Sequence, residues 1–434
     1  MEKLFQLKQR GTTAKREFLA GFTTFLTMAY ILAVNPAILG VIGGNMTPGA
    51  VFTATAIASG VATLMMAFTA NLPVALAPGM GINAFFTYTV VIGMGFSWQL
   101  ALTAVFLEGI VFFILSLFNI RMLIIKAIPE NVNKAIVVGI GLFIALVGFA
   151  NAGIIVHGAG TLLEFGDMSQ PSVLLALLGF VLIIVLHTLK APGAILIGIL
   201  GTTIISIIAG VTVIPSGWMP LSLPAAPLFF QFELSSDILT LKFFSVFFTL
   251  LIVNIFDSFG TLLGVSAQAG LRDNDGNIPR IKQALLSNAV GTFVGAGLGT
   301  STLICYVESS SGVAAGGRTG LTSVSTGMLF FLALLFSPVF LLIPGFATAP
   351  VLIFVGFLMM SQVIVIDFKD PAEGIPAFLT IVMMPFAYGI AHGIMYGILS
   401  YCVLKAVTGK WKDISLVTWI LFVIFALRFF IQVR

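Results

Sequence analysis

The sequence predicts an all-α polytopic membrane protein, because its composition is far too apolar for a soluble domain. Of the 434 residues, 59% are hydrophobic and only 8% are charged, and the mean hydropathy is +1.15. A soluble domain would carry roughly 25% charged residues. The apolar runs are near ~20 residues long, which suits helices, whereas barrel strands alternate over about 10 residues. The lipid bilayer is therefore an expected partner.

The apolar runs predict seven spans on each side of a proline-rich connection, residues 214–242. The first set is expected near 18–40, 50–70, 74–93, 98–118, 132–150, 172–188 and 193–213. The second set is expected near 243–264, 281–298, 302–322, 324–343, 347–366, 375–390 and 393–408. An apolar tail at 414–432 remains, and it is compatible either with a further span or with packing against the bundle.

The basic residues predict the orientation. With the N-terminus in the cytoplasm, five basic residues of the N-terminal arm and eleven of the even-numbered connections lie inside, and only Lys242 lies outside. The eleven are Arg121, Lys126, Lys134, Lys190, Arg272, Arg280, Lys282, Lys369, Lys405, Lys410 and Lys412. This satisfies the positive-inside rule, so we expect a multi-pass protein of a bacterial cytoplasmic membrane. The basic residues form no single face, so no nucleic-acid partner is expected.

An odd number of spans in each half predicts an inverted repeat. Residues 193–200, GAILIGIL, echo GIMYGIL at 393–399, and VALAPGMG at 74–81 corresponds in place to CYVESSSG at 305–312. The latter pair predicts an extended segment followed by a half-helix in the third and tenth spans, although simple kinks would also explain the glycines and prolines. Broken spans at matching positions point to a transporter binding site.

Three acids, Glu108, Asp257 and Glu308, lie well inside expected spans. An acid in hydrocarbon costs several kcal/mol unless it is paired, protonated or facing a watery cavity. Asp257 belongs to one polar stripe on its helix and is expected to face the protein interior; the stripe comprises Asn254, Asp257, Ser258 and Thr261. Glu108 has no such stripe and is expected to be a structural or protonated carboxyl.

Glu308 is expected to begin the second half-helix. The free N–H groups of Ser309, Ser310 and Ser311 would then point into a cavity. A neutral planar ligand with N–H donors and carbonyl acceptors suits such a site, because the carboxylate can accept from its N–H edge.

Two further positions are candidates for the site. Asn83 lies early in the first half-helix, where it is placed to bind a ligand, to orient Asp257 or to join helices. Thr23, Thr27 and Tyr30 share one face of the first span, which is consistent with lining a cavity or with packing.

Motifs for other chemistries are absent from the sequence. GAGLGT at 295–300 lacks the GK[ST] ending of a phosphate loop, and there is neither HExxH nor a nucleophile elbow. Cys305 and Cys402 provide no metal-ligand spacing. An enzyme and a resident cofactor are therefore not expected. Uphill transport would draw on an ion gradient, and one proton moving down 100 mV supplies about 2.3 kcal/mol.

Four segments resemble the purine-nucleobase permeases, more narrowly the AzgA-like branch of the nucleobase–cation symporter-2 family. They are FTTFLTMAYILAVNP in the first expected span, APGMGINAFF in the third, NIFDSFGTLLG in the eighth and YVESSSGVAAGGRTGLTSV in the tenth. The resemblance extends from about residue 10 to 410. It implies the uracil-permease fold, a 7+7 inverted repeat with core and gate domains and with broken third and tenth spans.

The resemblance also implies a domain division. The expected units are a cytoplasmic arm (1–17), core spans 1–4 (18–118), gate spans 5–7 (119–213), an extracytoplasmic linker (214–242), core spans 8–11 (243–343), gate spans 12–14 (344–408) and the apolar tail (409–434). It further implies that Asp257, Glu308 and Asn83 form the substrate site, that the substrate is hypoxanthine, guanine or adenine carried with protons, and that two copies can form a homodimer.

These observations lead to the hypothesis of proton-coupled purine import. Glu308 would bind the ring N–H edge, Asp257 would bind the opposite side, Asn83 would fix Asp257, and either acid would carry the proton. Ser309, Ser310 and Thr27 are expected to complete the substrate site. An anion transporter of the same fold remains an alternative, although two buried acids argue against it. A channel would need a filter-like repeat or a charged ring, and an intramembrane aspartate protease would need a second aspartate.

Overall fold

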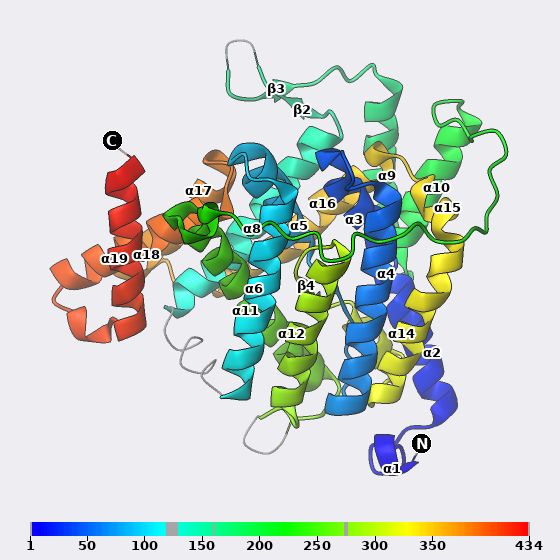
Figure 1. The fold of residues 1–434 in the computed structure, drawn as a ribbon, viewed down its shortest axis with the longest axis horizontal. Coiled ribbons are helices and arrows are strands. Elements are labelled where there is room, and N and C mark those ends of the chain that lie inside the picture. The colour runs from blue at the N-terminus through cyan, green and yellow to red at the C-terminus, as the bar shows by residue number, and fades with distance from the viewer. Residues whose placement is uncertain (1, 119–128, 159–160, 273–276, 433–434) are drawn as a thin grey trace.

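The computed structural model describes residues 2–118, 129–158, 161–272 and 277–432, and helices fill most of it (Figure 1). The connection 119–128, with Arg121 and Lys126, lies outside the described residues. The first half contains α1 (Glu2–Phe5), α2 (Ala14–Met28), α3 (Ile31–Leu39), η1 (Gly40–Ile42), α4 (Pro48–Met65), η2 (Met66–Ala70), β1 (Leu76–Pro78), α5 (Met80–Ala84), η3 (Phe85–Gly93), α6 (Trp98–Leu117), α8 (Glu130–Asn151), β2 (Ile155–Val156), β3 (Glu164–Phe165), α9 (Pro171–Thr188) and α10 (Ala194–Ile208).

The second half repeats the same order of long and broken helices. It contains η4 (Ser236–Leu239), α11 (Leu241–Gln268), α12 (Ile281–Leu298), β4 (Leu303–Cys305), α13 (Ser309–Ala314), α14 (Gly320–Ala333), η5 (Leu334–Phe336), α15 (Ser337–Leu341), α16 (Gly345–Met360), η6 (Ser361–Val365), α17 (Pro371–Phe386), α18 (Ile390–Val407), η7 (Trp411–Asp413) and α19 (Leu416–Gln432). Within the described residues, nine helices are long and apolar enough to cross a membrane, and shorter apolar helices include Met80–Gly93 and Ala194–Ile208. The predicted helical polytopic fold is confirmed.

The two predicted breaks meet at the centre of the molecule. β1 and β4 form an antiparallel pair in which Leu76 lies opposite Cys305 and Pro78 opposite Leu303. Tyr306 N donates to Ala75 O at 3.0 Å, which extends the pairing by one step. Each extended segment therefore satisfies backbone groups of the other, which is the condition for irregular backbone at membrane depth. The broken-span prediction is confirmed, and a continuous kinked helix is excluded at both positions.

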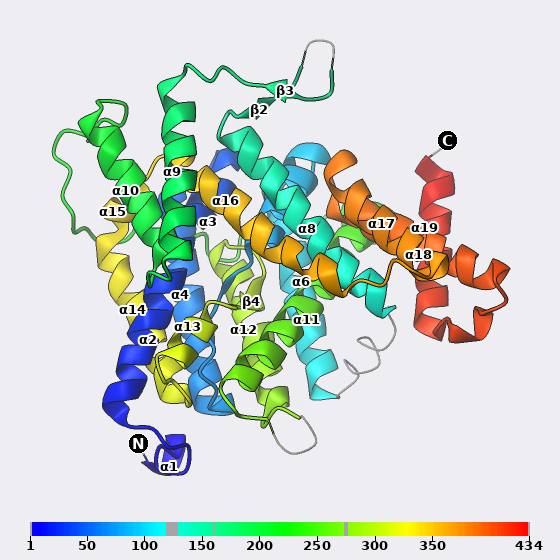
Figure 2. The ribbon, with the colours of Figure 1, turned by 180° about the vertical axis from the view of Figure 1, so that it is seen from behind.

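The long helices pack in two groups. In one group α12 packs against α4 and α6, while α14 packs against α2 and α4. In the other group α8 packs against α16 and α17, α9 against α10 and α16, and α17 against α18. In the back view α8 and α16 lie alongside each other, with α2, α4 and α14 to one side of them (Figure 2). The first group includes the helices that flank the β1–β4 pair, so it holds both broken spans.

The linker 214–242 has few helical residues and runs past the end of α12. Leu228 N donates to Leu298 O at 3.0 Å, and Phe230 N donates to Gly297 O at 2.8 Å, so the linker is attached to the end of α12. At the other end of the chain, α19 packs against α18. Its Phe425 also meets Phe248 of α11, with ring centroids 6.3 Å apart. The tail therefore packs against the bundle through its first turns.

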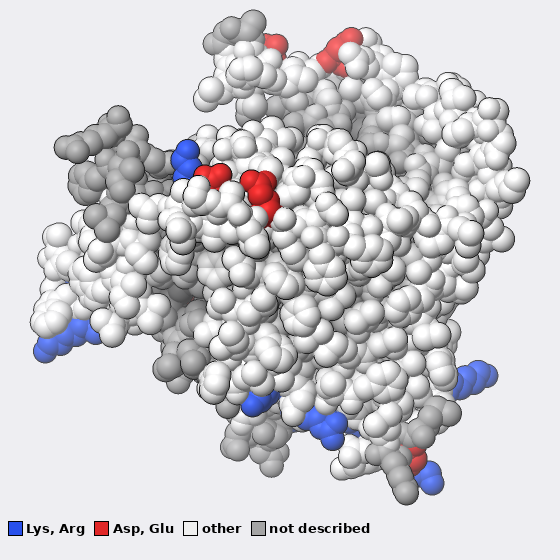
Figure 3. Space-filling model, in the orientation of Figure 1, with Lys and Arg blue, Asp and Glu red and all other residues white. Residues whose placement is uncertain are grey.

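Charge is distributed unevenly over the visible face. In Figure 3 Lys and Arg gather mainly toward the rim near the N-terminus, while Asp and Glu gather mainly toward the opposite rim. The broad band between the rims is almost free of charge, as a surface facing lipid requires.

Two charged residues lie differently from their expected positions. Glu17 is the last residue of the expected cytoplasmic arm (1–17), but α2 begins at Ala14 and Glu17 is fully buried. Its carboxylate accepts from Thr319 Oγ1 at 2.8 Å and Thr322 Oγ1 at 2.6 Å, and so caps α14. Arg318 falls within the expected tenth span (302–322), but α13 ends at Ala314 and Arg318 lies in the turn before α14. The small residues GVAAGG end the half-helix early.

Candidate functional site

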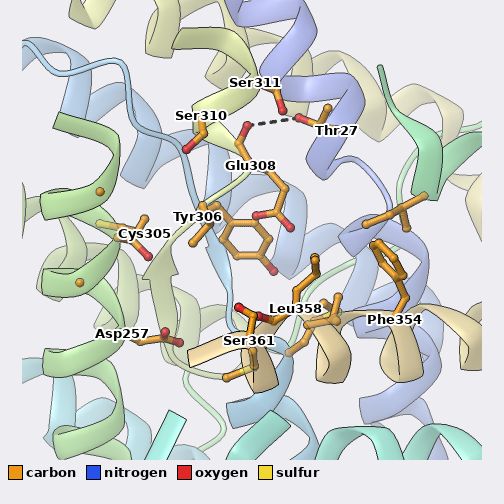
Figure 4. Close-up of a pocket in the computed structure, with 18 of the residues that line it drawn as sticks. Thr27, Asp257, Cys305, Tyr306, Glu308, Ser310, Ser311, Phe354, Leu358 and Ser361 are labelled. Carbon is orange, nitrogen blue, oxygen red and sulfur yellow. Dashed lines mark hydrogen bonds between the residues drawn. The ribbon is translucent and has the colours of Figure 1, made fainter. Parts of the chain in front are cut away.

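A cavity of about 1450 Å³ lies between the two groups of helices. Its polar side is formed by α2, α11 and the β4–α13 segment, and Phe354, Leu358 and Ser361 line it from α16 and η6 (Figure 4). The lining also includes Lys134 and Lys190, which come from connections expected on the cytoplasmic side. The cavity therefore extends from the broken spans toward that side.

Glu308 lies in this cavity and immediately precedes α13, as predicted. Tyr30 Oη donates to Glu308 Oε1 at 2.5 Å. Thr27 Oγ1 lies 3.4 Å from the backbone carbonyl oxygen of Glu308 (Figure 4). Thr23, Thr27 and Tyr30 all line the cavity, so the polar face of the first span borders it rather than packing against another helix. The Glu308 carboxylate is thus held by a neutral donor.

Asp257 lies on α11 and lines the same cavity. In the described part of the chain, no hydrogen bond or ion pair joins its carboxylate to another side chain. The four residues of the predicted polar stripe on α11 face two different environments. Asp257 and Thr261 line the cavity, whereas Asn254 and Ser258 are buried against α6 and α12. Two acids therefore face one cavity from two different segments.

The expected arrangement of the serine N–H groups is wrong. The amides of Ser309, Ser310 and Ser311 donate to the carbonyl oxygens of residues 306, 307 and 308, at 3.1, 2.9 and 2.9 Å. They are used by the turn that starts α13, so they are not free for a ligand. Ser310 and Ser311 still line the cavity, but Ser309 is fully buried and its Oγ accepts from Ala75 N at 3.0 Å.

Asn83 has a different partner from the expected one. It is fully buried on α5 and lies outside the cavity lining. Its Oδ1 accepts a hydrogen bond from Ser301 Oγ, and its Nδ2 has no hydrogen-bond partner among the described residues. No hydrogen bond joins it to Asp257 there, because Asn83 belongs to the first broken span and is turned toward the chain before β4. The proposed fixing of Asp257 by Asn83 is therefore wrong for this conformation.

Glu108 forms the centre of a buried network that the sequence analysis missed. Asn254 Nδ2 donates to Glu108 Oε1 at 2.7 Å, and Thr302 Oγ1 donates to Glu108 Oε2 at 2.8 Å. Asn288 Nδ2 donates to Asn254 Oδ1 at 2.8 Å, and Ser258 Oγ donates to the same oxygen at 3.1 Å. No stripe marks Glu108 on its own helix, because its partners come from other elements. The sequence did contain one signal for this network. Asn254 and Ser258 are polar residues on a helix expected to be buried, so they require hydrogen-bond partners from other elements.

The fold and site define a helical membrane transporter with a polar cavity at two broken spans. A family model described as "Permease family" matches residues 15–396. The chain belongs to this family, the nucleobase–cation symporter-2 permeases. It is a transporter and not an enzyme. Within the described residues no group of three His, Cys, Asp or Glu could hold a metal ion.

Relatives from bacteria and archaea match almost the whole chain. A putative permease of Methanocaldococcus jannaschii is 48% identical, covering 99% of this chain and 98% of its own. The adenine permease AdeQ of Escherichia coli is 44% identical, with 99% and 96% covered. The guanine/hypoxanthine permease PbuO of Bacillus subtilis is 43% identical, with 99% of both chains covered.

Solved structures show the same fold at low sequence identity. The transmembrane domain of the cyanobacterial bicarbonate transporter BicA superposes with a TM-score of 0.66 at 15% identity, covering 88% of this chain and 97% of that domain. The murine anion transporter Slc26a9, in its inward-facing state, gives a TM-score of 0.61 at 14% identity, covering 90% of this chain and 69% of that chain. These structures share the 7+7 inverted repeat, which confirms the predicted architecture.

Proposed function

We propose that this protein imports purine nucleobases together with protons across a cytoplasmic membrane, with its N-terminus in the cytoplasm. The observation that carries the proposal is the pair of acids, Asp257 and Glu308, facing one cavity beside the two broken spans. Relatives named as adenine permeases and as guanine/hypoxanthine permeases support the substrate class.

Carboxylates accept hydrogen bonds, and a purine presents N–H groups on its ring edge. Glu308 binds one N–H edge of the base, and Asp257 binds the opposite side or carries the coupling proton. Phe354 and Leu358 provide an apolar surface opposite the acids on which a planar ring can lie. Thr27 and Ser310 border the site. The Ser310 hydroxyl can donate to an acceptor atom of the base, whereas the Thr27 hydroxyl donates to the carbonyl oxygen of Thr24 at 2.9 Å and can only accept from the base. Neither Ser309 nor Asn83 contacts the base in this conformation.

Transport follows if one group of helices moves against the other. The core domain comprises expected spans 1–4 and 8–11, and the gate domain comprises spans 5–7 and 12–14. The acids belong to the core and Phe354 belongs to the gate, so relative motion of the two domains changes access to the site from one side to the other.

Anion transport is the competing function, because solved structures with the same fold include anion transporters. The chemistry of the cavity argues against it. Two carboxylates border the site, and a bound anion would be repelled by both. The helix α13 has six residues and its first amides are already bonded, so it offers no compensating N–H groups.

Ligand binding to purified protein separates the two functions. Radiolabelled hypoxanthine, adenine and bicarbonate would each be tested against wild type and Glu308→Gln. We expect purine binding in wild type and a loss of about tenfold or more in affinity in the variant, because hydrogen bonds to a charged group are worth about 1.5–3 kcal/mol. Bicarbonate binding without purine binding would contradict the proposal. Glu164→Gln, an exposed acid in the β2–β3 hairpin, is the matched control.

A further inference from the structure

Glu108 is a fully buried carboxylate for which purine binding by Asp257 and Glu308 provides no role. Both of its oxygens accept from neutral donors, Asn254 and Thr302. The ion pairs of the described chain involve Glu130, Asp370 and Glu373, and none reaches Glu108. A buried carboxylate without a cation is costly unless hydrogen bonds satisfy it, so its presence here needs a reason.

Joining helices is not a sufficient reason. The first repeat has a corresponding junction, in which ILAVN at 31–35 matches LLIVN at 250–254. There Asn35 Nδ2 donates to Thr55 Oγ1 at 2.6 Å and to Thr300 Oγ1 at 2.8 Å. Neutral hydroxyls therefore join the helices in the first repeat. In the second repeat the asparagine lies 3.4 Å from the hydroxyl of Thr292 but only 2.7 Å from the Glu108 carboxylate.

A carboxylate differs from a hydroxyl because it only accepts hydrogen bonds. Asn254 must therefore present its NH₂ group to Glu108 and its Oδ1 to the other side. Asn254 Oδ1 then accepts hydrogen bonds from Ser258 and from Asn288. Glu108 therefore determines that Ser258 and Asn288 act as donors toward Asn254. Ser258 Oγ, with its proton used in this way, accepts from Cys305 N at 3.3 Å.

The network ends on the two segments that carry the cavity acids. On α11, Ser258 is the residue next to Asp257. On the extended segment, Thr302 precedes β4 and Cys305 is its last residue; both are bonded to the network, and Glu308 follows Cys305 by three residues. One buried carboxylate thus links the backbone that supports Asp257 to the backbone that supports Glu308.

We propose that Glu108 is a positioning residue, which holds Asp257 and Glu308 at the separation that a purine requires. It acts from outside the cavity, since neither it nor its direct partners line the cavity. This inference rests on the proposed function, because it concerns how the same site binds its base.

The test measures hypoxanthine binding by purified Glu108→Gln and Thr302→Val. In Glu108→Gln, the glutamine can present its oxygen to Asn254 and its NH₂ to Thr302, whose hydroxyl then rotates, so the fold has a satisfied alternative. Thr302→Val removes one hydrogen bond to Glu108 and keeps the acid. The matched control is Thr202→Val, which removes an equally buried hydroxyl whose bond stays within its own helix, α10.

Affinity and binding capacity distinguish positioning from folding. We expect both variants to raise Kd about tenfold at an unchanged number of binding sites per protein, because mispositioned acceptors weaken hydrogen bonds to every bound base. A merely structural role would lower the number of sites and leave Kd as in Thr202→Val, and that result would overturn the inference. If Glu108→Gln cannot be purified, the Kd of Thr302→Val compared with that of Thr202→Val tests the inference by itself. Wild type that binds no purine would instead refute the proposed function.

Discussion

At the scale of single residues, the acids inside the protein differ in how completely they are hydrogen-bonded, and this difference matches the roles that we propose for them. Glu17 and Glu108 are fully buried and accept hydrogen bonds from several neutral donors, which satisfies their lone pairs within the protein. Asp257 and Glu308 are only partly buried and face the cavity. Acceptors that border open space are available for a ligand or a proton. The acids for which we propose a role in binding are therefore those that the fold leaves incompletely bonded.

Tyr30 provides a residue-scale test of how Glu308 is held. Tyr30→Phe removes the hydroxyl that donates to Glu308 Oε1 but preserves the ring packing. We expect the KM for hypoxanthine uptake to rise severalfold, because the carboxylate loses the partner that orients it. Kinetics of uptake in vesicles would measure this. Tyr388→Phe, whose ring packs against Phe143, is the control, and an equal KM in both variants would contradict the assigned role.

The N-terminus of α17 permits a pH test outside the membrane. The backbone N–H of Ala372 and the ammonium group of Lys410 hold the pKa of Asp370 below its ordinary value. A carboxyl whose pKa is lower when folded stabilises the protein above its unfolded pKa, about 3.9, and this contribution is lost as pH falls through the folded pKa.

Asp370→Asn is therefore expected to lower the melting temperature at pH 7 and to match wild type at acidic pH. Thermal unfolding of the two proteins in detergent, measured from pH 7 down to pH 3, would show the convergence. A difference that stays constant over this range would show that the charge of Asp370 contributes nothing.

At the scale of elements, the position of α13 depends on close contact with α2. A Cβ atom built on Gly312 would lie 2.0 Å from Thr24 Oγ1 and 2.7 Å from the carbonyl oxygen of Ala20. Such contacts force the two helices apart. Because α13 directly follows Glu308 and α2 carries Thr27, the spacing of the two elements sets one wall of the cavity.

Gly312→Ala should therefore reduce both stability and uptake. We expect a lower melting temperature and a loss of hypoxanthine uptake, because the backbone of Ala20 cannot move away easily. Gly345→Ala is the matched control, since its Cβ would meet nothing within 4 Å. Uptake by Gly312→Ala equal to that of the control would show that close packing of α13 on α2 is dispensable.

The sequence predicted the elements better than the contacts between them. Hydropathy and turn residues located the spans, and the interruptions at Pro78 and Glu308 predicted both extended segments, because these signals are local. The partners of Glu108 and Asn83 could not be read in the same way. Asn254, Thr302 and Ser301 are distant in sequence from Glu108 and Asn83, and only the packing of α11 on α6 and the pairing of β1 with β4 bring them into place. The serine amides were misjudged because the turn at 306–311 satisfies them locally.

At the scale of the whole molecule, two hydrogen bonds join the helix groups at the side opposite Lys134 and Lys190. Asn151 Nδ2 of α8 donates to Tyr88 Oη at 2.7 Å, and Thr89 Oγ1 donates to the carbonyl oxygen of Tyr388 at 3.4 Å. These contacts join the third span to α8 and to the connection before α18. If access alternates, they must break when the cavity opens to this side.

A crosslink between two cysteines introduced by Tyr88→Cys and Asn151→Cys should therefore stop transport. Both native cysteines are buried, so a short bismaleimide would react mainly at the introduced pair. We expect crosslinked protein to lose hypoxanthine uptake, while each single variant treated in the same way retains it. Full uptake by the crosslinked protein would contradict movement of the gate against the core at this side.

The most direct measurement is uptake of radiolabelled hypoxanthine into proteoliposomes, with and without an inward proton gradient, with unlabelled adenine and guanine as competitors. We expect accumulation above equilibrium only when the gradient is present, competition by purines, and loss of accumulation in Glu308→Gln. Vesicles that contain folded protein and accumulate no base under any gradient would contradict proton-coupled purine import by this protein.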